Sequence, residues 1–323
     1  MIDAQGRRID YLRLSVTDRC NLRCLYCLPP TGVQPKAHGD ILRYEEMELL
    51  VRAGVLEGIR KVRITGGEPL VRRDLVQLVR MLSRIPDLQD LSLTTNGELL
   101  AEVAADLRKA GLRRVNISLD SLDPDTYRRI TRGGELRRVL RGLEAALAVG
   151  LHPVKINVVL LRGLNQHEVD RFVEMARSLP VAVRFIELMP LGEAYRRHED
   201  YFLPVQWVID RLGPGWHPVP GQGGGPAVYW GHPDAAGTIG CIAALSEHLC
   251  ARCNRIRVGA AGEGYACLSR PPVMEFRSAL RRGADLTTLR MLFRKLVASK
   301  PAGHAMARRH PALRRRLMAK LGG

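Results

Sequence analysis

The stretch VTDRCNLRCLYCLPP, residues 16–30, places Cys20, Cys24 and Cys27 within eight positions. A closed tetrahedral zinc site takes four ligands, and the nearest histidine, His38, lies eleven positions beyond the third cysteine. Iron–sulfur clusters normally take four thiolates, so a trio leaves one iron open to a ligand that is not protein. The spacing CxxxCxxC also differs from the CxxC pair of zinc fingers. These residues favour an open cluster over a zinc site.

A second cysteine trio lies near the other end of the chain, in CARCNRIRVGAAGEGYACL. It consists of Cys250, Cys253 and Cys267, and the seventh cysteine, Cys241, is predicted to be a small buried apolar residue. An odd total argues against complete disulfide pairing, and cysteines in a reducing compartment are more often metal ligands. The chain shows no apolar run of about 20 residues and no leader-like start, so we expect a cytoplasmic protein without a membrane partner.

The charge distribution raises a second class of function. The formal charge is +17, and residues 277–320 contain thirteen Arg or Lys against one acid, Asp285. A zinc protein that binds nucleic acid is one interpretation of this basic tail. The tail has few aromatic residues that could stack on bases, so we favour a solvated helical surface and expect no nucleic-acid partner.

Short β-branched or apolar runs alternate with longer amphipathic ones from residue 11 to residue 188. The predicted strands are residues 11–16, 61–65, 90–95, 113–119, 152–161 and 181–188. The predicted helices between them are residues 44–57, 71–84, 98–110, 124–149 and 166–178. Alternating units of this kind predict an α/β fold with a parallel sheet, and six of them fall short of the eight of a complete barrel.

Polar residues follow the first four predicted strands directly. Thr17 and Asp18 lead into the first cysteine loop, and the sequences GGEP, NG and DS follow the next three strands. The carboxyl ends of parallel strands meet at one edge, so we expect one shared site there.

After about residue 190 the alternation is lost in a segment rich in Gly and Pro. We therefore predict two domains, 1–212 and 213–323, with a helix from Ser278 to about Ser299 and a second basic helix over 305–320.

The first trio, with Tyr26 directly before its last cysteine, resembles the radical S-adenosylmethionine (SAM) superfamily, and TGGEP at 65–69 resembles that superfamily's second signature. The resemblance implies a 4Fe–4S cluster whose open iron holds SAM, together with cleavage of SAM to a 5′-deoxyadenosyl radical. It also implies that Gly66 and Gly67 let the backbone approach SAM, with Glu68 near its ammonium. In chemistry of this kind the protein positions and shields the radical that the cofactor produces.

Further motifs resemble the GTP 3′,8-cyclase family of molybdenum cofactor biosynthesis: YLRLSVTDRCN, VRITGGEP, TTNG, SLDSLD, RFIELMP, CNRIRV and the terminal GG. The resemblance implies an incomplete TIM-type (β/α)6 barrel with a C-terminal α+β domain closing the open side. It implies a second 4Fe–4S cluster on the second trio. The implied reaction is abstraction of hydrogen from the ribose 3′ carbon of GTP, giving 3′,8-cyclo-7,8-dihydro-GTP.

Individual residues take roles from this resemblance. It implies metal ligation by Cys20, Cys24, Cys27, Cys250, Cys253 and Cys267; SAM contacts by Tyr26, Gly66, Gly67, Glu68, Ser118 and Met189; GTP contacts by Arg13, Arg63, Thr94, Lys155, Arg255, Ile256 and Arg257; and catalytic roles for Arg13, Arg255, Arg257, Gly322 and Gly323. Arg255 and Arg257 alternate along one strand-like piece and should face the same side, where guanidinium groups suit phosphate.

The implied partners are a low-potential electron donor of the flavodoxin or ferredoxin type, the next pathway enzyme (cyclic pyranopterin monophosphate synthase) and a second copy of the chain in a homodimer. A radical SAM enzyme that modifies peptides, also with auxiliary clusters, is the alternative within the superfamily. Such enzymes usually carry more C-terminal cysteines than the three grouped here.

Overall fold

The computed structural model describes residues 1–221, 225–247, 249–304, 306 and 311–318. A twelve-stranded sheet runs through this part of the chain in the order β12-β11-β10-β1-β2-β3-β4-β5-β6-β9-β8-β7. Its strands are β1 (Tyr11–Ser15), β2 (Lys61–Thr65), β3 (Asp90–Thr95), β4 (Arg114–Ser118), β5 (Val154–Leu160), β6 (Val181–Glu187), β7 (His217–Val219), β8 (Val228–Gly231), β9 (Thr238–Ile242), β10 (Arg255–Val258), β11 (Glu263–Tyr265) and β12 (Met274–Glu275).

The six predicted strands are neighbours in sequence order, and all of their pairings are parallel. The C-terminal part of the chain extends this sheet at both edges: β10 pairs with β1 and β9 pairs with β6, again in parallel. Antiparallel strands then follow outside β9 and β10. The predicted α/β partial barrel is confirmed, and its sheet is wider than the sequence indicated.

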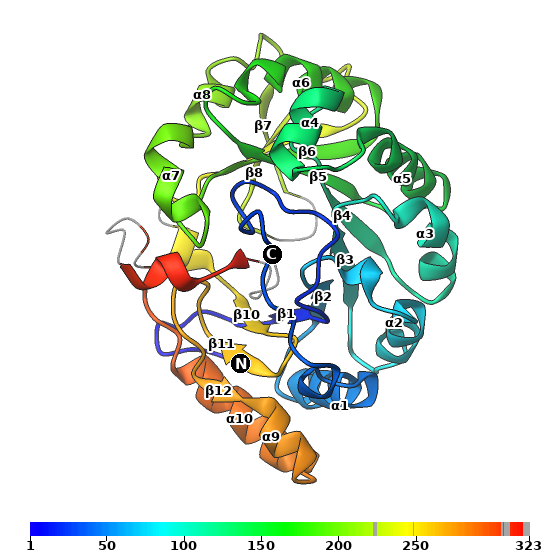
Figure 1. Cartoon of the computed structure of the whole chain (residues 1–323), viewed down its shortest axis with the longest axis vertical. Coiled ribbons are helices and arrows are strands. Elements are labelled where there is room, and N and C mark those ends of the chain that lie inside the picture. Colours follow the sequence, from blue (N-terminus) through cyan, green and yellow to red (C-terminus); the bar gives the residue numbers. More distant parts are fainter. Residues whose placement is uncertain (222–224, 248, 305, 307–310, 319–323) are drawn as a thin grey trace.

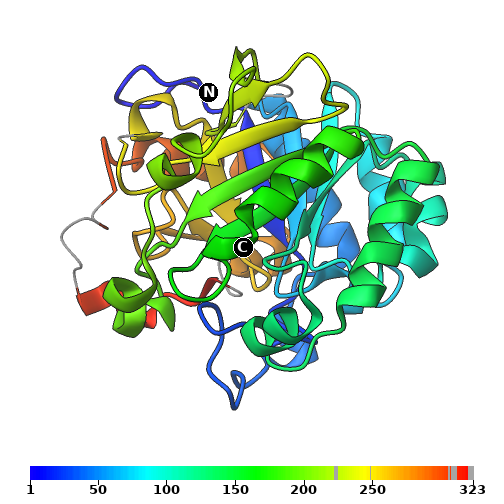
Figure 2. The same cartoon turned by 90° about the horizontal axis from the view of Figure 1, so that it is seen from above.

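Helices cover the outer face of the curved sheet. They are α1 (Tyr44–Leu56), α2 (Leu75–Ser83), α3 (Leu100–Lys109), α4 (Pro124–Thr131), α5 (Leu136–Ala148), α6 (Val169–Ser178), α7 (Ala194–Tyr201), α8 (Gln206–Ile209), α9 (Phe276–Arg281) and α10 (Leu286–Ala298). Figure 1 shows α1 to α6 as an arc along the outside of the strands, and Figure 2, turned by 90°, shows the same helices outside the sheet. No helix in the described ranges is long and apolar enough to cross a membrane.

Two predicted helices are each broken in two. The segment predicted as one helix over 124–149 stops at Thr131, because Arg132 and Gly133 adopt positive φ angles of 56° and 120°. In the same way Gly283, with φ of 80°, separates α9 from α10. Only a short 3-10 turn, Pro311–Arg315, is described within the predicted basic helix over 305–320, and the rest of that range lies largely outside the described residues.

The core lies between the sheet and these helices. Apolar residues of β1 to β6 alternate with polar ones, and the apolar side chains pack outward against the helices. Cys241 of β9 is 4% exposed within this core, which confirms the expectation for the seventh cysteine. The polar half of the alternation therefore faces the inside of the barrel, where the site is built.

Candidate active site

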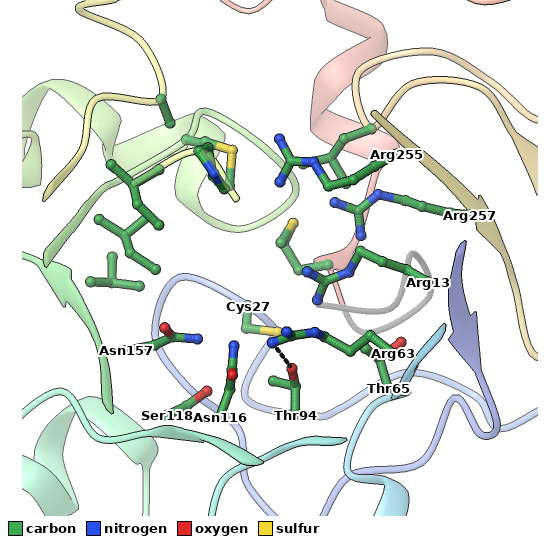
Figure 3. A pocket seen from close by; sticks show the side chains of 18 of the residues that line it. Arg13, Cys27, Arg63, Thr65, Thr94, Asn116, Ser118, Asn157, Arg255 and Arg257 are labelled. Carbon is green, nitrogen blue, oxygen red and sulfur yellow. Dashed lines mark hydrogen bonds between the residues drawn. The ribbon is translucent and has the colours of Figure 1, made fainter. Parts of the chain in front are cut away.

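A pocket of about 360 Å³ opens inside the barrel, and all six cysteines of the two trios line it. Figure 3 shows side chains from opposite walls pointing into this space. The first trio comes from the loop after β1, and the second comes from the loops that flank β10 and β11. Segments more than 200 residues apart in the sequence thus supply one cavity.

The first cysteine loop is held by backbone bonds in a tight turn. The N–H groups of Cys27 and Leu28 both donate to the Cys24 carbonyl, at 2.9 and 3.1 Å, and the loop docks on α4 through Leu25 N–H, which donates to Ile130 O at 2.9 Å. The Leu22 N–H donates to Cys20 Sγ at 3.4 Å. Burial raises the pKa of Cys20 to about 11 and raises the pKa of Cys24 well above its ordinary value.

The TGGEP turn after β2 contacts this cysteine loop directly. Gly67 N–H donates to Thr17 O, and Glu68 N–H donates to Arg19 O, both at 2.8 Å. A Cβ atom on Gly67 would lie 2.2 Å from the Arg19 carbonyl oxygen, and one on Gly66 would lie 2.8 Å from that of Thr17. The glycines therefore permit a backbone contact between the two loops, in addition to the approach to SAM that the resemblance implies.

Two buried carboxylates lie beside the first trio. Burial raises the pKa of Glu68 to about 7, and its oxygens accept bonds from Thr95 Oγ1 at 2.7 Å and Asn96 N–H at 2.6 Å. Burial likewise raises the pKa of Asp120 to about 6, and this carboxylate accepts a 2.5 Å bond from the Tyr26 hydroxyl. Asp120 thereby fixes the aromatic ring that precedes the last cysteine of the trio.

A row of arginines forms one wall of the pocket. Arg257, Arg13 and Arg63 are register partners on the adjacent strands β10, β1 and β2, so their side chains point to the same side. Figure 3 shows these guanidinium groups with that of Arg255, and Arg63 Nη1 donates to Thr94 Oγ1 at 3.5 Å. Burial and the neighbouring arginines lower the pKa of Arg13, and burial lowers that of Arg257 to about 10. Such crowded cations suit a polyanionic ligand.

The opposite wall contains residues that the sequence analysis named and others that it missed. Ser118 and Met189 line the pocket, as do Asn116, Asn157 and Arg184, which were not predicted. Arg184 Nη2 donates to Asn157 Oδ1 at 2.5 Å. The sequence did contain a signal for Asn116. Residues two positions apart on a strand face the same side, and Asn116 lies two positions before Ser118 on β4.

Two predicted site residues do not line the pocket, and two others are not described. Lys155 is 1% exposed and does not line the pocket; its Nζ is 3.3 Å from the Tyr229 hydroxyl, and burial lowers its pKa to about 7. Ile256 points to the opposite face of β10, into the core, so only its backbone can approach a ligand. Gly322 and Gly323 lie outside the described residues.

The second trio has a different electrostatic environment. A 3-10 turn at Leu249–Arg252 brings Cys253 N–H to the Cys250 carbonyl at 3.1 Å. Burial raises the pKa of Cys253, but Arg255 and Lys300 outweigh this effect and hold that pKa at about 6. Carboxylates therefore lie near the first trio and cations near the second.

The donor set distinguishes a cluster from a single metal ion. None of the seven cysteines forms a disulfide bond. A zinc–sulfur bond of about 2.3 Å brings the thiolates of one zinc ion to roughly 4 Å from each other. Within the described ranges, no three His, Cys, Asp or Glu side chains are close enough together to hold one ion. Three thiols in each of two groups around one pocket are the donor set of a 4Fe–4S cluster with one iron open.

Similarity to known proteins covers the entire chain. Residues 14–176 match the Radical SAM superfamily, and residues 181–306 match the family described as Molybdenum Cofactor Synthesis C. The GTP 3′,8-cyclase of Desulforamulus reducens is 47% identical over 328 residues, with both chains covered completely. The GTP 3′,8-cyclase of Geobacter sulfurreducens is also 47% identical, over 100% of this chain and 99% of the relative. Among solved structures, Streptococcus suis SuiB has a TM-score of 0.58 at 14% identity, covering 89% of this chain and 68% of that one, which is a likeness of fold alone.

Proposed function

Because this chain belongs to the GTP 3′,8-cyclase family within the radical SAM superfamily, we propose that it converts GTP to 3′,8-cyclo-7,8-dihydro-GTP for molybdenum cofactor biosynthesis. The observation that carries the proposal is the arrangement of two open cysteine trios and a row of arginines around one pocket. A polyanionic nucleotide that spans the cavity would reach both trios at once.

The first trio is the candidate ligand set for the cluster that holds SAM. With SAM bound, a cluster held by Cys20, Cys24 and Cys27 would supply the electron for radical chemistry at the ribose 3′ carbon. The chain's part is to hold the reactants. Tyr26, oriented by Asp120, and the TGGEP turn enclose the cysteine loop, while Ser118 and Met189 face the same space.

The arginine row is the candidate triphosphate site. GTP carries roughly four negative charges, and guanidinium forks bind phosphate oxygens in pairs. Arg13, Arg63, Arg255 and Arg257 all line the pocket that the two trios share. An anion there offsets the repulsion among these cations and leaves the base and ribose to extend toward the remaining space. Lys155 is not part of this row, because it lies on β5, does not line the pocket and has its Nζ 3.3 Å from the Tyr229 hydroxyl.

Peptide modification is the less favoured function. The likeness to Streptococcus suis SuiB is one of fold, at 14% identity. Four pocket arginines are better suited to a triphosphate than to a peptide backbone. Anaerobic incubation with SAM, dithionite and GTP, followed by mass analysis of the products, separates the two. Formation of 5′-deoxyadenosine without a cyclised nucleotide would contradict the cyclase proposal.

The partners follow from the chemistry. Each turnover begins with one electron at low potential, so we propose a flavodoxin or ferredoxin as donor and cyclic pyranopterin monophosphate synthase as the enzyme that takes the product. We also propose a homodimer. Seven cysteines without a disulfide bond suit a reducing compartment, so we propose that the enzyme works in the cytoplasm.

Replacing Arg255 or Arg257 with Ala should weaken GTP binding by about 1.5–3 kcal/mol, the range for hydrogen bonds to charged groups. The reason is the loss of a guanidinium that faces the pocket. GTP affinity measured by calorimetry, with iron content unchanged, provides the check. The exposed Arg282→Ala is the matched control, and equal affinity in all three variants would show that Arg255 and Arg257 do not bind GTP.

Deleting Gly322 and Gly323 should leave the iron content and SAM binding unchanged but reduce GTP cyclisation by about 100-fold, the cost of a small misplacement in a site. The resemblance implies that this terminal pair reaches into the active site, where backbone without side chains can enter a crowded pocket. Product formation per 5′-deoxyadenosine formed is the measurement. Gly323→Ala should have the smaller effect if backbone contact is what matters. A truncated enzyme that cyclises GTP at the full rate would make the pair an ordinary chain end.

A further inference from the structure

Lys300 is a buried lysine that the proposed mechanism does not use. It follows α10, is 4% exposed and lines the pocket. Its Nζ donates to the carbonyl oxygens of Arg255 at 2.7 Å and Ala266 at 2.8 Å. Arg255 is two residues after Cys253, and Ala266 directly precedes Cys267. One ammonium group therefore joins the two chain segments that carry two of the three thiols of the second trio.

The residues just after Lys300 hold the third thiol. His304 N–H donates to Cys250 Sγ at 3.3 Å. Arg7 connects the same partners, because its Nη1 donates to Cys250 O at 2.8 Å and its Nη2 donates to Pro301 O at 2.7 Å. Asp3 holds Arg7 in place by an ion pair of 2.6 Å. The segment 300–304 thus contacts all three cysteine-bearing segments of the second trio.

The positive charge of Lys300 also lies close to the second trio. Lys300 and Arg255 are the cations beside Cys253, whereas Glu68 and Asp120 lie beside the first trio. A cation near the thiolates of a cluster stabilises the state with one more electron, and hydrogen bonds and net charge set cluster potentials in general. Removing a buried charge changes this balance far more than removing an exposed one, because water does not screen it.

We propose that Lys300 is a positioning residue for the second cluster: it ties the segments of Cys253 and Cys267 together and raises that cluster's reduction potential relative to the first. This inference rests on the proposed function, in which the second trio holds a 4Fe–4S cluster. If Lys300 only filled the core, its replacement would leave the reduction potential of the second cluster unchanged.

The test is a redox titration of the anaerobically reconstituted full-length enzyme, followed by electron paramagnetic resonance. Lys300→Gln keeps hydrogen-bond donors without the charge, Lys300→Met removes both, and Lys300→Arg keeps the charge. The matched control is Lys295→Gln, an exposed cation on α10. Iron content and circular dichroism are measured on each variant.

In Lys300→Gln the equilibrium constant for one-electron reduction of the second cluster should fall at least tenfold, which is 59 mV toward lower potential. The first cluster's potential should not change. Lys300→Met should show the same shift or lose the irons of the second site alone, and Lys300→Arg should recover the potential.

Unchanged potential and iron content in Lys300→Gln and Lys300→Met, or the same shift in Lys295→Gln, overturns the inference. Global unfolding of both Lys300→Gln and Lys300→Arg overturns it too, since the role would then be structural. A wild-type protein that holds only one cluster contradicts the proposed function instead.

Discussion

Replacing Cys24 with alanine should halve the iron content of the reconstituted protein, from about eight irons per chain to about four, and abolish SAM cleavage. Cys24 is the centre of the first cysteine turn, since the N–H groups of Cys27 and Leu28 both bond to its carbonyl. A trio has no spare thiolate, so the loss of one leaves two ligands for four irons. Iron and sulfide analysis with a 5′-deoxyadenosine assay measures both effects.

Two further cysteine variants make this prediction specific. Cys253→Ala should also halve the iron content, yet leave some cleavage of SAM uncoupled from GTP, because the first trio is intact. Cys241→Ala is the control, since that side chain packs in the core and should leave the full iron content. Full iron in both Cys24→Ala and Cys253→Ala would show that the trios are not the cluster ligands.

Replacing Gly67 with alanine should reduce activity at least 100-fold, although the residue carries no reactive group. Its added Cβ would lie 2.2 Å from Arg19 O and 2.6 Å from Arg19 C, and both are backbone atoms that cannot rotate away. The turn between β2 and α2 would therefore separate from the cysteine loop and break the Gly67–Thr17 bond of 2.8 Å. SAM affinity should fall with the activity, while the second cluster remains.

Gly39→Ala is the matched control for this variant, because an added Cβ there has no heavy atom within 4 Å. It should behave as wild type in iron content, SAM affinity and turnover. Wild-type SAM affinity in Gly67→Ala would mean that the two loops need not touch.

The sequence predicted the first six strands to within two residues because each is a short apolar run between longer amphipathic segments. It also placed the cysteine loop and the TGGEP turn at the carboxyl ends of those strands. It failed where one local residue decides the outcome: Arg132 adopts a left-handed conformation that no periodicity reveals, so the predicted helix over 124–149 became α4 and α5. Helix propensity is a weak guide against such a break.

The pairing of β9 and β10 with the edges of the barrel sheet could not be predicted either. Both strands are short and separated from their partners by many residues, and local pattern contains no information about register between distant segments. Lys300 was missed for the same reason. It follows an ordinary amphipathic helix, and only the folded chain brings its ammonium to the carbonyls beside Cys253 and Cys267.

The pairing of β1 with β10 has a consequence for the newly made chain. The side chains of Asp10 and Asn254, next to these strands, bond at 2.6 Å across 244 residues of sequence. At a synthesis rate of about 5–20 residues per second, roughly 12–50 s pass between the emergence of the two segments. Throughout that interval β1 presents unpaired backbone groups, and β6 does so until β9 arrives, so a nascent chain has two open sheet edges of the kind that promote aggregation. Ribosome-bound chains of this enzyme should accordingly depend on chaperones until β10 has been made.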